Sequence, residues 1–224
     1  DWSDVLRMQE GIELNVVYRE RQYSVMGNII KPDPKRDNEY LILLYWLDQT
    51  ELKTIQKKYA EEKTDVCIIL VDNYDDVMNS MDESQKPQMS SMIAKYMREW
   101  IGDADGVLKK LDRDRYIFMF EHKYLNKFIE GKFELLDRVR EISVGNKTPA
   151  TMSLGIGCGG ENIARNDEYA RMALDMALGR GGDQAVIKDD GQFSFYGGKT
   201  KEHEKSTRVK SRVIAYALRQ LIMS

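Results

Sequence analysis

The stretch GVLKKLDRDRYIFMFE, residues 106–121, decides the fold of this chain. Its two halves, Gly106–Leu111 and Arg115–Glu121, have the length and apolar content of short β-strands. The polar residues Asp112-Arg113-Asp114 stand between them and predict a tight turn. Residues 106–121 therefore predict an antiparallel hairpin, and the elements on either side of it set the fold.

Strands and helices alternate before and after this hairpin. The expected elements are a strand at 66–72, helices at 87–100 and 124–142, a strand at 150–157, a helix at 162–178 and a hairpin at 185–188 and 192–196. Pro87 suits the first turn of its helix, and Gly179 suits the end of the alanine-rich helix. A further helix is expected from about Ser206. The order βαββαβαββ predicts an α+β fold with one central antiparallel sheet and packed helices, similar to the ferredoxin-like plan.

The first 48 residues predict a short helix followed by antiparallel β structure. Strands are expected at 11–18, 22–30 and 40–47. Two prolines mark residues 31–37 as a charged loop, because proline cannot pair within a central strand.

Residues 49–63 predict a linker helix and hold the expected domain boundary. Leu52, Ile55 and Tyr59 recur at helical spacing and form a narrow apolar stripe among charged residues. Such a stripe pairs with another helix or rests on a domain. We therefore expect a homodimer.

The composition is that of a globular protein, with 224 residues, 42% hydrophobic and 32% charged. A net charge of −3 argues against a nucleic-acid-binding surface. The two cysteines, Cys67 and Cys158, give neither a disulfide framework nor a zinc site, which fits a reducing compartment. The apolar run Leu41–Leu47 is too short to span a bilayer. Because the chain opens and closes within expected helices, we expect a piece of a longer protein.

Several motifs in this order resemble those of GGDEF domains, the nucleotide-cyclase fold of bacterial signalling. The run Ile69–Tyr74 is similar to the family's first strand, D-x-D-x-F, and Thr151–Gly157 is similar to its later strand. Residues 175–186 resemble its last helix and exit. Upstream, Leu47–Glu51 resembles the D-x-T-E exit of PAS domains, which makes residues 1–48 the C-terminal part of a PAS domain.

Two further stretches resemble the GdpP-type cyclic-di-AMP phosphodiesterases. They are ALGRGGDQAVIK, residues 177–188, and FYGGKT, residues 195–200, which runs on into RVKSRVI at 208–214. The resemblance implies residues 64–200 as a degenerate GGDEF domain and 201–224 as the start of a helix toward a DHH phosphoesterase domain that this chain lacks. It also implies the cytoplasmic portion of a membrane-anchored bacterial protein.

The resemblance implies that the domain is no cyclase. A working GGDEF domain holds divalent metal ions with acids on neighbouring strands, and these ions activate a nucleotide triphosphate. The first acid corresponds to Leu70 and the second to Asp72. The signature falls on Asp112–Tyr116, where both glycines are lost, Asp114 keeps an acid and Arg115 replaces the next one. The guanine-reading asparagine corresponds to Met78.

What remains is a candidate nucleotide cleft. Its residues are Asp72, Asp112, Arg113, Asp114 and Arg115, with Asp72 and Asp114 as candidate ligands of Mg or Mn. Arginine matches phosphate oxygens, so ATP or GTP is the expected ligand. The alternative is that residues 112–115 form only a polar hairpin tip. Three functions stay open: a signal relay with a nucleotide-sensing cleft, a slow magnesium-dependent NTPase, and a dimerisation module without ligand.

Four further patterns are interpreted structurally. Gly181-Gly182-Asp183 is interpreted as a helix exit, and residues 155–160 fit G-x-G-x-x-G without the context of a dinucleotide site. Gly198-Lys199-Thr200 lacks the first glycine of a P-loop. His122 and His203 are interpreted as surface residues. Haem, which PAS domains of this family bind, is not expected, because only the latter half of a PAS fold is present.

Overall fold

The computed structural model describes residues 13–30 and 41–197. The chain divides after Glu62 into two compact units, residues 1–62 and 63–224. The helix expected before residue 11, the loop 31–37 and everything expected after residue 197 lie outside the described residues.

The first unit contains a three-stranded antiparallel sheet in the order β1-β2-β3, as predicted. Its strands are β1 (Leu14–Tyr18), β2 (Arg21–Ile30) and β3 (Leu41–Asp48). Arg19 and Glu20 connect β1 to β2 with φ of 46° and 64°, the left-handed backbone that a tight two-residue hairpin turn requires. The large apolar side chains of β3 are exposed, among them Leu43, Tyr45 and Trp46.

Helix α2 (Thr50–Glu61) follows at the predicted linker position. It buries none of its residues in the structure described. Leu52, Ile55 and Tyr59, the predicted stripe, are 51%, 58% and 66% exposed.

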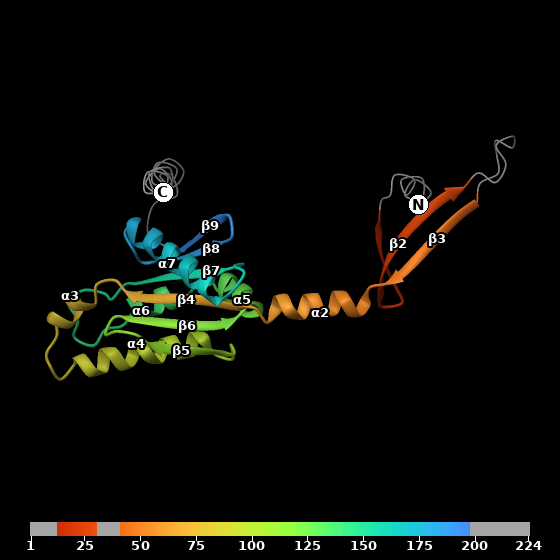
Figure 1. The fold of residues 1–224 in the computed structure, drawn as a ribbon. Coiled ribbons are helices and arrows are strands. Elements are labelled where there is room, and N and C mark those ends of the chain that lie inside the picture. The colour runs from red at the N-terminus through yellow and green to blue at the C-terminus, as the bar shows by residue number, and fades with distance from the viewer. Residues whose placement is uncertain (1–12, 31–40, 198–224) are drawn as a thin grey trace, which may run out of the picture. The chain divides into compact units, whose positions relative to one another are not determined.

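The second unit is built on a six-stranded sheet in the order β5-β6-β4-β7-β8-β9 (Figure 1). Its strands are β4 (Thr64–Val71), β5 (Gly106–Lys110), β6 (Arg115–Glu121), β7 (Met152–Cys158), β8 (Gln184–Asp189) and β9 (Gln192–Gly197). The order β5-β6-β4-β7 is the ferredoxin-like arrangement that the element order predicted. One pair, β7 with β8, is parallel, because α7 connects them as a crossover, so the sheet is mixed.

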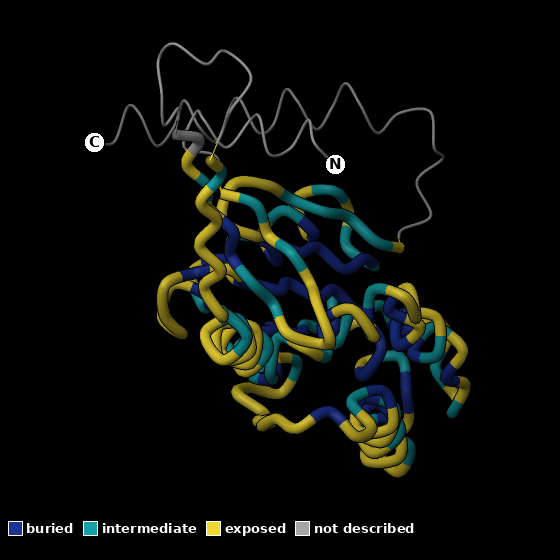
Figure 2. The backbone as a smooth tube through the Cα atoms, turned by 90° about the vertical axis from the view of Figure 1, so that its right-hand side faces the viewer, coloured by how far each residue is buried: buried dark blue, intermediate teal, exposed yellow. Residues whose placement is uncertain are grey.

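Helices cover both faces of this sheet, and the central strands are buried between them (Figure 2). Helix α4 (Lys86–Ile101) packs on the larger core through Met89, Ile93 and Trp100. Helix α7 (Ile163–Gly179) covers the other face and packs Ala170 and Leu174 on Val66 and Ile68 of β4.

The helix predicted over residues 124–142 is wrong as a single element. The structure has a short 3₁₀ turn, η2 (His122–Tyr124), then α5 (Leu125–Glu130) and α6 (Leu135–Arg140). The break falls at Lys132 and Phe133, whose φ values are 50° and 54°. Phe133 is completely buried, and its ring lies 5.1 Å from that of Tyr196. Burial of this aromatic ring offsets the strain of the left-handed backbone. A short helix that was not predicted, α3 (Tyr74–Asn79), follows β4.

The glycines of the G-x-G-x-x-G pattern let α7 approach β7 closely. A Cβ on Gly155 would lie 2.3 Å from the carbonyl oxygen of Ala170, and one on Gly157 would lie 2.0 Å from that of Asn166. No real side chain tolerates such distances. These glycines therefore serve helix–strand packing.

Cys67 and Cys158 are free thiols, both buried, as the sequence predicted for Cys67. Burial raises the pKa of each thiol. No helix within residues 13–30 and 41–197 has the length and apolar content needed to cross a membrane.

Candidate functional site

The predicted cleft residues lie at one end of the sheet, where β4 ends and the β5–β6 hairpin turns. The amide of Val71 donates to the carbonyl oxygen of Asp114 at 2.9 Å, and Leu70 pairs with Arg115 across the strands. The structure thus places the backbone of the hairpin tip directly beside the residue that precedes Asp72.

Two side chains of the hairpin tip already have partners. Arg113 donates from Nη2 to Oδ2 of Asp75 on α3 at 3.0 Å, and the amide of Arg113 donates to Oδ1 of Asp112 at 2.7 Å. The Arg113–Asp75 pair is 64% and 59% exposed, so it is weak and open to competition from a ligand. Asp114 and Arg115 form no side-chain hydrogen bond or ion pair with any described residue.

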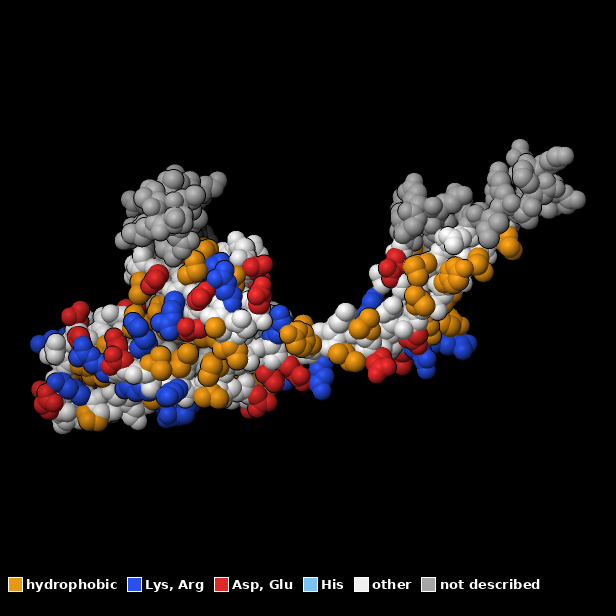
Figure 3. Space-filling model, viewed as in Figure 1, with side chains coloured by type: hydrophobic (Ala, Val, Ile, Leu, Met, Phe, Trp, Pro, Cys, Tyr) orange, Lys and Arg blue, Asp and Glu red, His pale blue; other side chains and the backbone are white. Residues whose placement is uncertain are grey.

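Acids outnumber bases around the hairpin tip and the first turn of α3. The charged side chains there are the acids Asp72, Asp75, Asp76, Asp112 and Asp114 and the bases Arg113, Arg115 and, at the end of β5, Lys109 and Lys110. A nucleotide triphosphate meets repulsion from these carboxylates unless a cation accompanies it. On the visible face of the domain, acidic and basic side chains are interspersed (Figure 3).

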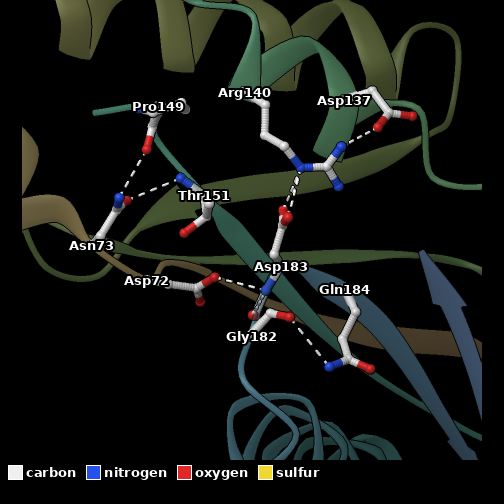
Figure 4. A network of polar contacts seen from close by, with 10 residues as sticks. Asp72, Asn73, Asp137, Arg140, Pro149, Thr151, Gly182, Asp183 and Gln184 are labelled. Carbon is white, nitrogen blue, oxygen red and sulfur yellow. Dashed lines mark hydrogen bonds and ion pairs between the residues drawn. The ribbon is translucent and has the colours of Figure 1, made fainter. Parts of the chain in front are cut away.

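Asp72 points toward the turn after α7 and not into open solvent (Figure 4). Its Oδ2 accepts a hydrogen bond of 2.9 Å from the amide of Asp183, which also lies 3.1 Å from Oγ of Ser153. A Cβ on Gly182 would come within 2.8 Å of the same carboxylate. Burial raises the pKa of Asp72, against the effect of hydrogen bonds from Ser153, Asp183 and Thr151. Asp72 therefore anchors the turn at residues 181–183.

The turn is held from its other side by Arg140 of α6. Nε of Arg140 donates to both carboxylate oxygens of Asp183, at 2.8 and 2.7 Å, and each side chain is only 17% exposed. Gly181, Gly182 and Asp183 have φ of 106°, 73° and 57°, so the chain reverses sharply here. We refer to Asp72, Gly182, Asp183 and Arg140 as the Asp183 clasp.

Gly181-Gly182-Asp183 forms the helix exit that the sequence predicts, but its contact with Asp72 was not predicted. The exit is real, since the amide of Gly182 donates to the carbonyl oxygen of Ala177 at 3.0 Å. One feature of the sequence could have indicated this contact: Asp183 directly follows two glycines, at a position where neither helix capping nor strand pairing needs a carboxylate.

Among the candidate metal ligands, the side chains present could offer a magnesium ion one or two carboxylates at most, and not an all-protein cage. Leu70 packs on the core beneath α7 and offers no ligand. Among residues 13–30 and 41–197, Oδ1 of Asp72 is buried and has no hydrogen-bond partner. Magnesium commonly takes one or two carboxylates and fills its remaining positions with water and phosphate oxygens. Within the described residues, no three His, Cys, Asp or Glu side chains form a metal-binding group.

His122, interpreted from the sequence as a surface residue, has a buried partner. Its side chain is 43% exposed, but Nδ1 lies 2.8 Å from Oδ2 of Asp65, whose side chain is 1% exposed. Asp65 was not among the residues predicted from the sequence to have a role. His203 lies outside the described residues.

Comparisons with known proteins identify the family to which this chain belongs. The family model "Cyclic-di-AMP phosphodiesterase GdpP-like, GGDEF domain" matches residues 69–195. The chain is 41% identical over 181 residues to the cyclic-di-AMP phosphodiesterase GdpP of Geobacillus thermodenitrificans, covering 80% of this chain and 28% of that protein. It is 38% identical over 189 residues to GdpP of Bacillus subtilis, covering 84% of this chain and 28% of that protein. The chain thus spans 28% of the length of these relatives.

A solved structure shares the fold. The crystal structure of the GGDEF domain of YfiN (TpbB) from Pseudomonas aeruginosa superposes with a TM-score of 0.50 at 12% sequence identity, covering 63% of this chain and 91% of that one. At this identity the likeness concerns the fold alone.

Proposed function

The chain belongs to the GdpP-like GGDEF family, and from this membership we propose that it is a regulatory segment of a cyclic-di-AMP phosphodiesterase. In this proposal the GGDEF-like domain makes no cyclic dinucleotide. It binds a nucleotide as its magnesium complex at the β5–β6 hairpin tip. The phosphodiesterase reaction belongs to a DHH phosphoesterase domain outside this chain, whose activity the nucleotide adjusts.

The hydrogen bonding of Asp72 is the observation that supports a domain that binds a nucleotide without cyclising it. A metal-dependent cyclase needs carboxylates that reach the metal ions, and here Leu70 is apolar while Asp72 is turned onto the Asp183 amide. Loss of both positions removes the means to activate the attacking hydroxyl. Binding requires less, namely charge balance and a few directed hydrogen bonds.

Asp114 and Arg115 are the residues proposed to carry that binding. In this proposal Asp114 holds the magnesium ion, while Arg115, together with Arg113 once it leaves Asp75, donates hydrogen bonds to phosphate oxygens. The local excess of carboxylates makes the ion a requirement. Mn²⁺ would serve as well, since it accepts the same oxygen ligands.

Titration calorimetry tests this site directly. We expect ATP or GTP to bind the purified chain with Mg²⁺ present and not with EDTA. Asp114→Ala should weaken binding at least about tenfold, because a charge-assisted contact is worth roughly 1.5–3 kcal/mol. Asp105→Ala is the matched control: it removes an exposed carboxylate just before β5, at the far end of the same hairpin, and should leave binding unchanged.

Failure of both nucleotides to bind would reject the sensing role and leave a purely structural coupling role. The unpaired carboxylate of Asp114 also favours slow hydrolysis of the bound nucleotide as a second function. Phosphate release that is equal in the parent chain and in Asp114→Ala would mean contamination and would reject that function. Formation of a cyclic dinucleotide by the chain would reject the main proposal.

The exposed stripe on α2 favours dimerisation as part of signal relay. Leu52, Ile55 and Tyr59 present apolar surface at the spacing used by paired helices. We expect light scattering to show a dimer at tens of micromolar, and Leu52→Glu with Ile55→Glu to give a monomer. Lys53→Glu changes charge beside the stripe and should remain dimeric. A parent chain that is monomeric at every accessible concentration would exclude this role for the isolated segment.

A further inference from the structure

A buried carboxyl group in contact with a histidine lies at the other end of the sheet, where β4 of the GGDEF-like domain begins. Asp65, the second residue of β4, is fully buried. Its Oδ2 lies 2.8 Å from Nδ1 of His122, and its Oδ1 has no hydrogen-bond partner in the part of the chain that the structure describes. A half-satisfied buried carboxylate is costly, so its protonation state matters to the structure around it. The proposed nucleotide site uses neither residue.

The pair is part of a set of contacts that fix the first residues of the domain. The amide of His122 donates to the carbonyl oxygen of Lys63 at 2.8 Å. Nδ2 of Asn166 on α7 donates to the carbonyl oxygen of Thr64 at 2.7 Å. Residue 63 directly follows the division between the two compact units. These contacts therefore fix the residues that connect the linker helix to β4.

Four titratable groups from different parts of the sheet interact with Asp65. His122 follows β6, Lys63 precedes β4, Asp189 ends β8 and Cys158 ends β7. Burial raises the pKa of Asp65 to about 6, while His122 and Lys63 lower it and Asp189 raises it. His122 is 43% exposed, so protons can reach the pair from solvent.

We propose that Asp65 and His122 form a proton-controlled anchor for the linker, which holds the start of β4 tightly when the pair gains a proton and loosens it when the proton leaves. The device makes the start of the second unit sensitive to mildly acidic conditions. It acts independently of any ligand at the hairpin tip.

The direction follows from proton linkage. The carboxyl has a higher pKa when folded than its ordinary value when exposed, so the closed state binds more protons between these two values. The stabilisation is therefore fully present below about pH 4 and is lost as the pH rises through about 6. Local opening at the start of β4 should be about tenfold more frequent at pH 7.5 than at pH 5, given an exposed pKa of about 3.9.

Hydrogen exchange of the amides at residues 63–67 and 122 measures this opening, after each rate is divided by the intrinsic rate at the same pH. The chain has only two histidines, which makes the controls clean. His203→Gln leaves His122 as the sole imidazole and should keep the tenfold effect. Asp65→Asn cannot titrate and should abolish the effect.

Two results would overturn the proposal. One is exchange in the parent chain that does not change with pH, and the other is Asp65→Asn retaining the full change. If Asp65→Asn fails to fold, NMR titration of the Asp65 carboxyl carbon in the parent chain decides the matter. A midpoint near 6 supports the anchor, and a midpoint near 4 rejects it.

Discussion

Gly157→Ala is expected to cost the GGDEF-like domain about 3 kcal/mol of its free energy of unfolding, at the upper end of the typical cost of overpacking a well-packed core. The new methyl group would lie 2.0 Å from the carbonyl oxygen of Asn166 and 2.5 Å from the amide nitrogen of Ala170. Both are backbone atoms of α7, so no side chain can swing away. The whole helix would have to move off β7.

Thermal unfolding measures the effect, and a fall in Tm of about 6–12 °C is expected for a domain of this size. Gly179→Ala is the matched control on the same helix, because a Cβ there meets nothing within 4 Å. It should leave Tm unchanged or raise it slightly, as alanine favours helix over glycine. Equal losses from both substitutions would show that close packing of α7 on β7 is not the cause.

Arg140→Met is expected to destabilise the domain by about 2–3 kcal/mol, which is at or just below the range for breaking a buried ion pair. The substitution keeps much of the aliphatic volume but leaves the Asp183 carboxylate without its cation. Because both side chains are only 17% exposed, water compensates poorly. Asp183 also holds a left-handed φ of 57°, so the turn that contacts Asp72 should loosen with it.

A double-mutant cycle separates the pair from general disruption. Asp183→Asn in the Arg140→Met background should cost little more, whereas the same change in the parent chain should cost more than 1 kcal/mol, within the usual range of coupling energies. Arg171→Met removes an ion pair to Asp167 in which Arg171 is 60% exposed, and should change stability by less than about 0.5 kcal/mol. Strictly additive effects of the two clasp substitutions would argue against the clasp.

Much of the fold could be predicted from the sequence because its signals are local. The hairpin at 106–121 is predicted by a polar turn between two apolar strands. The order of strands and helices then determined a ferredoxin-like sheet. The break between α5 and α6 could not be predicted, because its cause is distant: Phe133 leaves helical geometry to bury its ring against Tyr196.

The candidate site was predictable only in part, for the same reason. Strand pairing brings Asp72 and residues 112–115 to one end of the sheet, as expected. The direction in which the Asp72 carboxylate points depends on Asp183, which is 111 residues away in the chain. The burial of Asp65 could not be predicted from neighbouring residues, because an acid at the start of a strand is usually exposed and only the tertiary fold buries this one.

Because Asp72 accepts a hydrogen bond from the Asp183 amide, an aspartate at this position of a sequence is not by itself evidence of catalytic activity. When a domain of this kind loses its chemistry, selection for a stable fold alone would preserve such a residue. Counting it as a surviving catalytic acid would then overestimate how many degenerate relatives still react.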